Sequence, residues 1–113
     1  MPADDADVRN RLVSLSRRAA HHLMAPTLDE YGQLTHRGTS TFLSPVERRL
    51  AARLIASFDA PVSDADLIDS VWLAGGNEQT LRVHVSRLRR RIAPARLAIT
   101  TVRGFGYMLR AAA

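Results

Sequence analysis

The chain contains no cysteine and no lysine, and it has no long apolar run. Without cysteine there is no disulfide framework, no thiolate metal site and no cysteine nucleophile. No segment approaches the roughly 20 consecutive apolar residues that cross a bilayer. Acidic residues (Asp4, Asp5) stand at the N-terminus, where a secretory signal would carry a basic and then an apolar stretch. We therefore expect a cytoplasmic protein whose 113 residues form one domain with a short appendage.

Acidic residues are also absent from the C-terminal third of the chain. The last acid is Glu78, and eight arginines follow it. The residues before Gln79 carry eight arginines against eleven acids, so the formal charge of +5 is concentrated in the C-terminal third. A folded domain with this separation of charge presents one strongly positive face, for which nucleic acid is the first candidate partner. Arginine suits phosphate in particular, because the guanidinium group pairs with phosphate oxygens.

The residues that could act in catalysis or bind a metal form no convincing pattern. His21 and His22 are adjacent, and adjacent side chains on a helix point about 100° apart, which makes shared ligation of one ion difficult. His36 and His84 have no flanking ligand pattern. No set of nucleophile, base and acid is evident. We therefore expect no enzymatic activity, no metal and no cofactor.

The N-terminal segment, residues 1–26, is predicted to form an amphipathic helix that lies outside the main domain. Apolar or small residues recur at helical spacing at Val8, Leu12, Leu15, Ala19 and Leu23, and Pro26 ends the pattern. Such a stripe packs against its own domain, or it forms a contact between two copies or with another protein. The sequence leaves these alternatives open.

Residues 27–43 change period and predict a small antiparallel sheet. Short polar and β-branched runs at 33–35 and 39–43 flank Gly38, which can form a turn with positive φ. Strands of this length do not form a stable sheet alone.

Two helices are predicted next, each with a start signal. Ser44-Pro45-Val46-Glu47 is a capping box, and Ser63-Asp64-Ala65-Asp66 is a similar signal with aspartate in place of glutamate. The predicted buried residues of the first helix are Val46, Leu50, Leu54 and Phe58, and those of the second are Leu67, Ile68, Val71 and Trp72.

A third helix over 79–92 and a hairpin over 97–109 complete the pattern. The helix places Leu81, Val85, Leu88 and Ile92 on one face and Val83, Ser86, Arg87 and Arg90 on the other. A helix with an apolar inner face and arginines outside can lie in a major groove. The hairpin carries Arg103 near its tip. Three helices followed by a hairpin, with the third helix basic, is the order of a winged helix.

Four segments carry a closer resemblance: Leu43–Glu47, Leu67–Trp72, Val83–Arg90 and Thr101–Tyr107. With this order and spacing, residues 27–110 resemble the C-terminal DNA-binding domain of OmpR/PhoB-type response regulators. The resemblance implies an α+β winged helix-turn-helix domain, here residues 27–113, with an N-terminal four-stranded sheet, three helices and a C-terminal hairpin wing. It also implies that the third helix enters the major groove and the wing arginine the minor groove.

The outward face of the third helix and the resemblance together predict a set of contact residues. Base contacts are predicted for Arg87, Ser86, Val83 and Arg103. Backbone contacts are predicted for Trp72, Thr80, Arg82, His84, Arg89, Arg90, Arg91, Thr101 and Tyr107. For Trp72 and His84, simple packing against the core is the alternative.

The sequence departs from the family pattern in three places. Arg82 replaces the usual acid at the entry to the third helix, and the loop 73–78, which touches RNA polymerase in some relatives, is short. The segment before the domain is too short for a receiver, so we expect no control by a receiver domain of the protein's own.

We therefore predict a sequence-specific regulator of transcription that binds double-stranded DNA in the nucleoid. RNA polymerase, and a second copy of the chain on tandem or inverted half-sites, are further partners to consider. The alternatives are a protein-interaction module that docks on RNA polymerase or another regulator, and an architectural DNA binder without sequence preference. Val83 is the only apolar residue predicted on the outer face of the third helix, which favours DNA over a protein partner.

Overall fold

The computed structural model describes residues 25–112, and the helix predicted over residues 1–26 lies almost wholly outside this range. The elements are, in chain order, β1 (Thr27–Leu28), β2 (Gln33–His36), β3 (Thr39–Phe42), α2 (Pro45–Ala56), β4 (Val62–Ser63), α3 (Asp64–Val71), α4 (Glu78–Ile92), the short 3-10 helix η1 (Ala93–Ala95), β5 (Leu97–Val102) and β6 (Gly106–Ala111). The predicted α+β winged helix is confirmed for this part of the chain.

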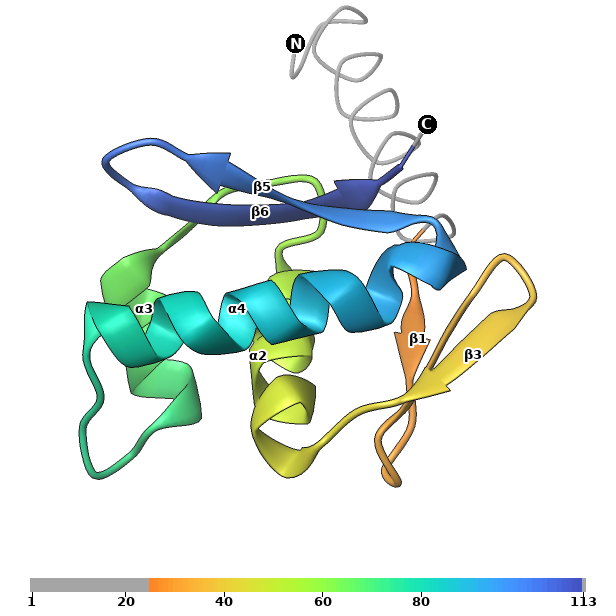
Figure 1. Cartoon of the computed structure of the whole chain (residues 1–113), viewed down its shortest axis with the longest axis horizontal. Coiled ribbons are helices and arrows are strands. Elements are labelled where there is room, and N and C mark those ends of the chain that lie inside the picture. Colours follow the sequence, from red (N-terminus) through yellow and green to blue (C-terminus); the bar gives the residue numbers. More distant parts are fainter. Residues whose placement is uncertain (1–24, 113) are drawn as a thin grey trace, which may run out of the picture.

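Two small sheets adjoin the helices on different sides (Figure 1). The hairpin of β5 and β6 runs along one side of α4, whereas β1 and β3 lie near the C-terminal end of that helix (Figure 1). The arrangement leaves a long flank of α4 uncovered by any other described element.

The N-terminal sheet is antiparallel in the order β1-β2-β3. The resemblance implied four strands here, and residues 25–112 contribute three of them. The turn between β2 and β3 consists of Arg37 and Gly38, both with positive φ (48° and 80°), between the paired residues His36 and Thr39. A two-residue hairpin turn of this kind matches the right-handed twist of its strands, as the position of Gly38 predicted.

Each helix begins where a side chain satisfies an amide of its first turn. In α2 the capping box is complete: the Glu47 amide donates to Ser44 Oγ (3.3 Å), and the Ser44 amide donates to Glu47 Oε1 (2.8 Å). Ser63 Oγ accepts from the Asp66 amide at 3.1 Å. The sequence missed the third cap, in which Asn77 Oδ1 accepts from the Thr80 amide at 2.8 Å. This cap explains why α4 begins at Glu78.

The predicted helix faces meet in one apolar core. Leu50, Leu54, Leu67, Leu81 and Leu88 are at most 1% exposed, and burying a leucine side chain contributes roughly 1.5–3 kcal/mol. The full inner stripe of α4 (Leu81, Val85, Leu88, Ile92) is buried as predicted. One detail is different: α2 ends at Ala56, so Phe58 follows the helix rather than lying on it, although it still packs against the core.

The wing is a three-stranded sheet in the order β4-β6-β5, and the sequence did not predict β4. The two-residue strand β4 pairs with Tyr107 and Gly106. The backbones approach so closely that a Cβ at Gly106 would collide with the Val62 carbonyl oxygen. The Asp64 amide also donates to the Phe105 carbonyl at 3.0 Å. These contacts attach the end of the wing to the start of α3.

Candidate nucleic-acid interface

The outward flank of α4 is basic. Arg82, Arg87 and Arg90 are exposed, and Val83 is 42% exposed beside them. Ser86 is half-buried. The helix therefore presents the predicted outer residues away from the core, because its four buried residues occupy the opposite face.

Arg87 and Arg90 are available for an outside partner. Among residues 25–112, neither guanidinium forms an ion pair or a hydrogen bond. With Arg91 they line an open surface hollow of about 280 Å³. Uncompensated guanidinium groups around a hollow suit an anionic ligand such as a phosphate backbone.

Arg89, predicted as a backbone contact, is bound to the wing. Its Nε donates to the Ile99 carbonyl at 2.9 Å and its Nη2 donates to Thr101 Oγ1 at 3.3 Å. The structure thus brings together two of the predicted DNA contacts, Arg89 and Thr101. The other N–H groups of this guanidinium remain for an outside acceptor.

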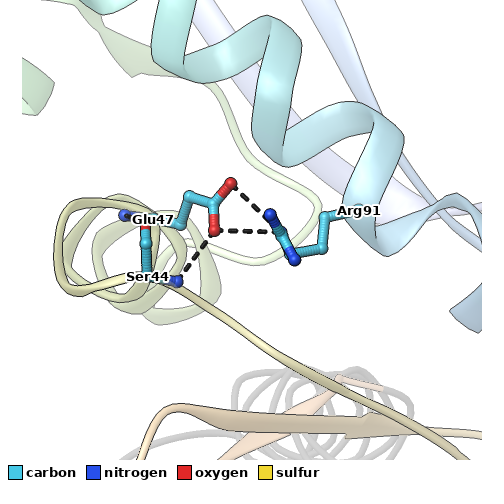
Figure 2. A network of polar contacts seen from close by, with 3 residues as sticks. All are labelled: Ser44, Glu47 and Arg91. Carbon is cyan, nitrogen blue, oxygen red and sulfur yellow. Dashed lines mark hydrogen bonds and ion pairs between the residues drawn. The ribbon is translucent and has the colours of Figure 1, made fainter.

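Arg91 is joined to the start of α2. Its Nε lies 3.0 Å from Glu47 Oε1 and 3.2 Å from Glu47 Oε2, as Figure 2 shows. The Glu47 side chain is only 3% exposed, whereas that of Arg91 is 50% exposed. The carboxylate that caps α2 therefore also fixes α2 to α4. The sequence identified Glu47 only as a cap.

The charge of Glu47 is held by its neighbours. Burial alone raises the pKa of this carboxyl group. The hydrogen bonds from Ser44 and the positive charge of Arg91 outweigh burial, so that the pKa of Glu47 lies below its ordinary value. The residue is therefore ionised at neutral pH and neutralises part of the Arg91 charge.

His84 and Trp72 pack against each other. Their rings meet edge to face with centroids 5.5 Å apart. His84 Nδ1 lies 3.0 Å from the Thr80 carbonyl oxygen, so this nitrogen carries the proton. In the neutral ring Nε2 is then an acceptor, and a phosphate contact from His84 requires the protonated form. Packing thus accounts for both side chains without DNA, while their predicted backbone contacts remain a prediction.

Thr80 and Tyr107 also have places in the fold. Thr80 Oγ1 donates to Asn77 Oδ1 at 3.1 Å, within the cap of α4. Tyr107 is half-buried against the core and lies opposite Thr101 in the hairpin. Neither contact prevents the predicted approach to a DNA backbone.

The N-terminal end of α4 is of mixed charge. Burial raises the pKa of Asp64, the nearby charge of Glu78 raises it further, and Arg82 acts in the opposite direction. The charge of Arg82 is therefore close enough to Asp64 to affect its ionisation. The positive surface is strongest farther along the helix, at Arg87 and Arg90.

The tip of the wing carries two exposed side chains. Arg103 is exposed, as predicted, and Phe105 is 48% exposed two residues later. The Phe105 amide donates to the Val102 carbonyl at 2.9 Å, and Gly104 takes a φ of 74° within this tight turn. Phe105 belongs to the turn between β5 and β6, and no pattern in the sequence distinguishes an exposed aromatic residue there from a packed one.

The loop between α3 and α4 exposes Leu73, which is 97% accessible. Gly76 lies over the ring of Trp72, where a Cβ would come within 3.0 Å of the indole. The loop is therefore held against Trp72 while Leu73 points outward.

Within residues 25–112, no helix is both long and apolar enough for a membrane crossing. The same residues contain no cluster of three or more histidine, cysteine, aspartate or glutamate side chains placed to hold a metal ion.

Comparison with known proteins gives consistent matches. The family model described as "Transcriptional regulatory protein, C terminal" matches residues 38–109. The chain is 40% identical over 74 residues to the transcriptional regulatory protein BasR of Escherichia coli (strain K12), which covers 64% of this chain and 32% of BasR. The chain thus spans about a third of the length of this curated relative.

Solved structures share the fold. The C-terminal domain of the nisin resistance regulator NsrR, a lantibiotic response regulator, aligns with a TM-score of 0.65 at 32% identity, covering 76% of this chain and 92% of that domain. The DNA-binding domain of the response regulator AdeR, solved in complex with an intercistronic region, aligns with a TM-score of 0.66 at 20% identity, covering 76% and 94%.

Proposed function

The chain belongs to the OmpR/PhoB-type family of C-terminal DNA-binding domains of transcriptional regulators, and on this basis we propose that it recognises a specific sequence in double-stranded DNA. In this proposal α4 lies in the major groove and the wing reaches the adjacent minor groove. The AdeR domain bound to an intercistronic region supports DNA as the partner.

The open arginine flank of α4 is the observation that carries the proposal. Arg87 and Arg90 are exposed, and within residues 25–112 their guanidinium groups form no ion pair or hydrogen bond. A helix fits the width of the major groove, and arginine forked onto guanine is the commonest specific contact there. Arg87 is therefore assigned the main base contact, with Ser86 and Val83 beside it.

The wing contributes a second proposed contact with the DNA, in the minor groove. Arg103 is exposed at a turn whose ends are fixed by backbone hydrogen bonds. An arginine presented in this way suits a narrow minor groove, where the negative potential is strong. Recognition in this groove then depends on its width more than on individual bases.

The phosphate contacts are unequal. Arg82 and Arg90 are exposed and contribute their charge directly. Arg89 and Arg91 have protein partners and offer a phosphate only the N–H groups that these partners leave free. Thr80, His84, Trp72, Thr101 and Tyr107 complete the proposed backbone contacts at the rim of the interface.

The test is a selection from a random duplex library, followed by affinity measurements on the selected and scrambled duplexes over a range of salt concentrations. We expect an enriched motif, repeated about one helical turn apart if two copies bind. Arg87→Ala should relax the preference at one position per half-site, a loss of about 1–3 kcal/mol of discrimination.

Arg90→Ala is the matched control, because it removes an equal charge one helical turn away. It should weaken selected and scrambled duplexes alike and reduce the salt slope by about 0.9 for one phosphate contact. Equal loss on all sequences for Arg87→Ala would remove its base-reading role. Binding without an enriched motif would indicate an architectural binder, and absence of binding at physiological salt would favour a protein-docking module.

A further inference from the structure

We propose that Arg89 is a positioning residue that fixes the spacing between the major-groove contact of α4 and the minor-groove contact of the wing. The inference rests on the proposed function and assigns to Arg89 more than a phosphate contact. Its basis is the pair of hydrogen bonds from one edge of the guanidinium to β5: Nε to the Ile99 carbonyl (2.9 Å) and Nη2 to Thr101 Oγ1 (3.3 Å). We call this arrangement the Arg89 latch.

The latch occupies the open edge of the wing sheet. β5 is an outer strand, with β6 on one side only. The Leu109 carbonyl accepts from the Asp59 amide, on the side of β6 away from β5. Because Ile99 lies directly opposite Leu109, the two form a non-hydrogen-bonded pair, and the Ile99 carbonyl points to the open edge. Arg89 therefore bonds a group that β6 does not use.

The latch also lies between the two proposed base-reading residues. Arg89 is two residues after Arg87 on α4, and Thr101 is two residues before Arg103 on the wing. Residues two apart on a helix point to nearly opposite sides, so Arg89 can bind the wing while Arg87 faces outward. The path from Arg87 to Arg103 through the latch thus spans only a few residues.

The chemistry of the latch requires arginine. A planar guanidinium donates from two nitrogens in a fixed geometry, so it holds the helix and the strand at one separation. Lysine keeps the positive charge but has a single donor atom on a flexible stem. Arg89→Lys therefore removes the paired hydrogen bonds of the latch but keeps the positive charge. Thr101→Val removes one acceptor without changing any charge.

The experiment compares two duplexes that differ in spacing. The first is the selected duplex, and the second has one base pair inserted between the position sensitive to Arg87→Ala and the position sensitive to Arg103→Ala. The wild-type protein should prefer the first by at least about fivefold, the lower end of what one good base contact contributes. Arg89→Lys and Thr101→Val should reduce this preference several-fold while the salt slope stays the same.

Arg110→Lys is the matched control, since Arg110 is an exposed arginine of β6 near the end of the hairpin away from the turn. It should keep the wild-type spacing preference. Two outcomes would show that Arg89 is only a phosphate contact and that the proposal is wrong. In the first, Arg89→Lys lowers the affinity for both duplexes equally. In the second, Arg89→Gln reduces the salt slope while Thr101→Val leaves the preference between the two duplexes unchanged. Should Arg89→Lys fail to fold, as judged by thermal melting, Thr101→Val decides.

A second readout needs no DNA. In the free protein, the Nε proton of Arg89 should exchange with water more slowly than those of Arg87 and Arg90, as measured by NMR. Fast exchange at Arg89 would disprove the latch even if the protein bound its duplex specifically. Slow exchange in a protein that selects no motif would instead show that the proposed function had failed while the latch was present.

Discussion

Two pairs of arginines on α4 use the same residue type in different ways. Arg89 is bound by the wing and Arg91 by Glu47, on different sides of the helix. Arg87 and Arg90 are exposed and form no ion pair or hydrogen bond within residues 25–112. The first pair positions the helix, and the second pair is free to contact a ligand. A count of arginines therefore overstates how many are open to an outside partner.

The sharpest test of this comparison sets two neighbouring residues of α4 against each other. Leu88 is 1% exposed in the core, and Arg87 is exposed beside it. Leu88→Ala should lower the free energy of unfolding by about 2–5 kcal/mol, because it leaves a cavity. Arg87→Ala should change it by no more than about 0.5 kcal/mol. Urea denaturation followed by circular dichroism measures both.

In DNA binding, the order of the two variants should be reversed: Arg87→Ala should have the larger effect and Leu88→Ala the smaller. Below the unfolding transition, Leu88→Ala should retain the sequence preference of the wild type, and Arg87→Ala should lose it. A large loss of stability in Arg87→Ala would mean that an open arginine also supports the fold, and the division between bound and open arginines would then be wrong.

Breaking the contact between Glu47 and the bound Arg91 should have the next largest effect on stability. Glu47→Gln preserves the shape of the side chain but removes the charge that faces Arg91. We expect a loss of about 1–3 kcal/mol in the free energy of unfolding at pH 7, as for other hydrogen bonds to charged groups. Arg91 remains half-exposed to water, which limits the loss.

The contribution of Glu47 to stability should also depend on pH. The pKa of Glu47 is lower in the folded protein than its ordinary value of 4.5. Its contribution to stability is therefore present above about pH 4.5 and is lost as the pH falls through the lower folded pKa. The stability advantage of wild type over Glu47→Gln should shrink as the pH falls below 4.5. Asp69→Asn, at an exposed position on α3, is the control, and an advantage that did not change with pH would exclude an ionic role.

The fold itself could be predicted in large part from local signals. Caps such as Ser44 and apolar stripes such as that of α4 act within a few residues, so the chain specifies them directly. Two local features were nevertheless missed. Asn77 follows two glycines, a pattern that predicts a loop rather than a helix cap, and β4 is a two-residue strand that exists only through its pairing with β6.

The partners of the arginines could not be predicted in this way. Glu47 and Arg91 are 44 residues apart in sequence, and their contact arises only when α2 packs against α4. Arg89 reaches Ile99 because the open edge of β5 lies beside the helix. Charge and spacing identified all of these arginines as candidates for DNA, but the division into bound and open arginines depends on tertiary packing.

The smallest expected effect lies at the N-terminal end of α4, where the open flank is least positive. Glu78→Gln removes a carboxylate that repels both Asp64 and an approaching phosphate. Burial and then the charge of Glu78 raise the pKa of Asp64, so the variant should lower that pKa, as followed by NMR titration of the Asp64 carboxyl group. An acid whose folded pKa is raised costs stability as the pH rises from its unfolded towards its folded value, and this cost should be smaller in the variant. The loss of an acid from the first turn of α4 opposes this gain, so the stability at pH 7 should change little.

Affinity for selected and scrambled duplexes should rise together, by no more than about threefold, since salt at physiological strength screens charges beyond roughly 8 Å. An increase confined to the selected duplex would place Glu78 at a base edge and extend the reading surface to the first turn of α4.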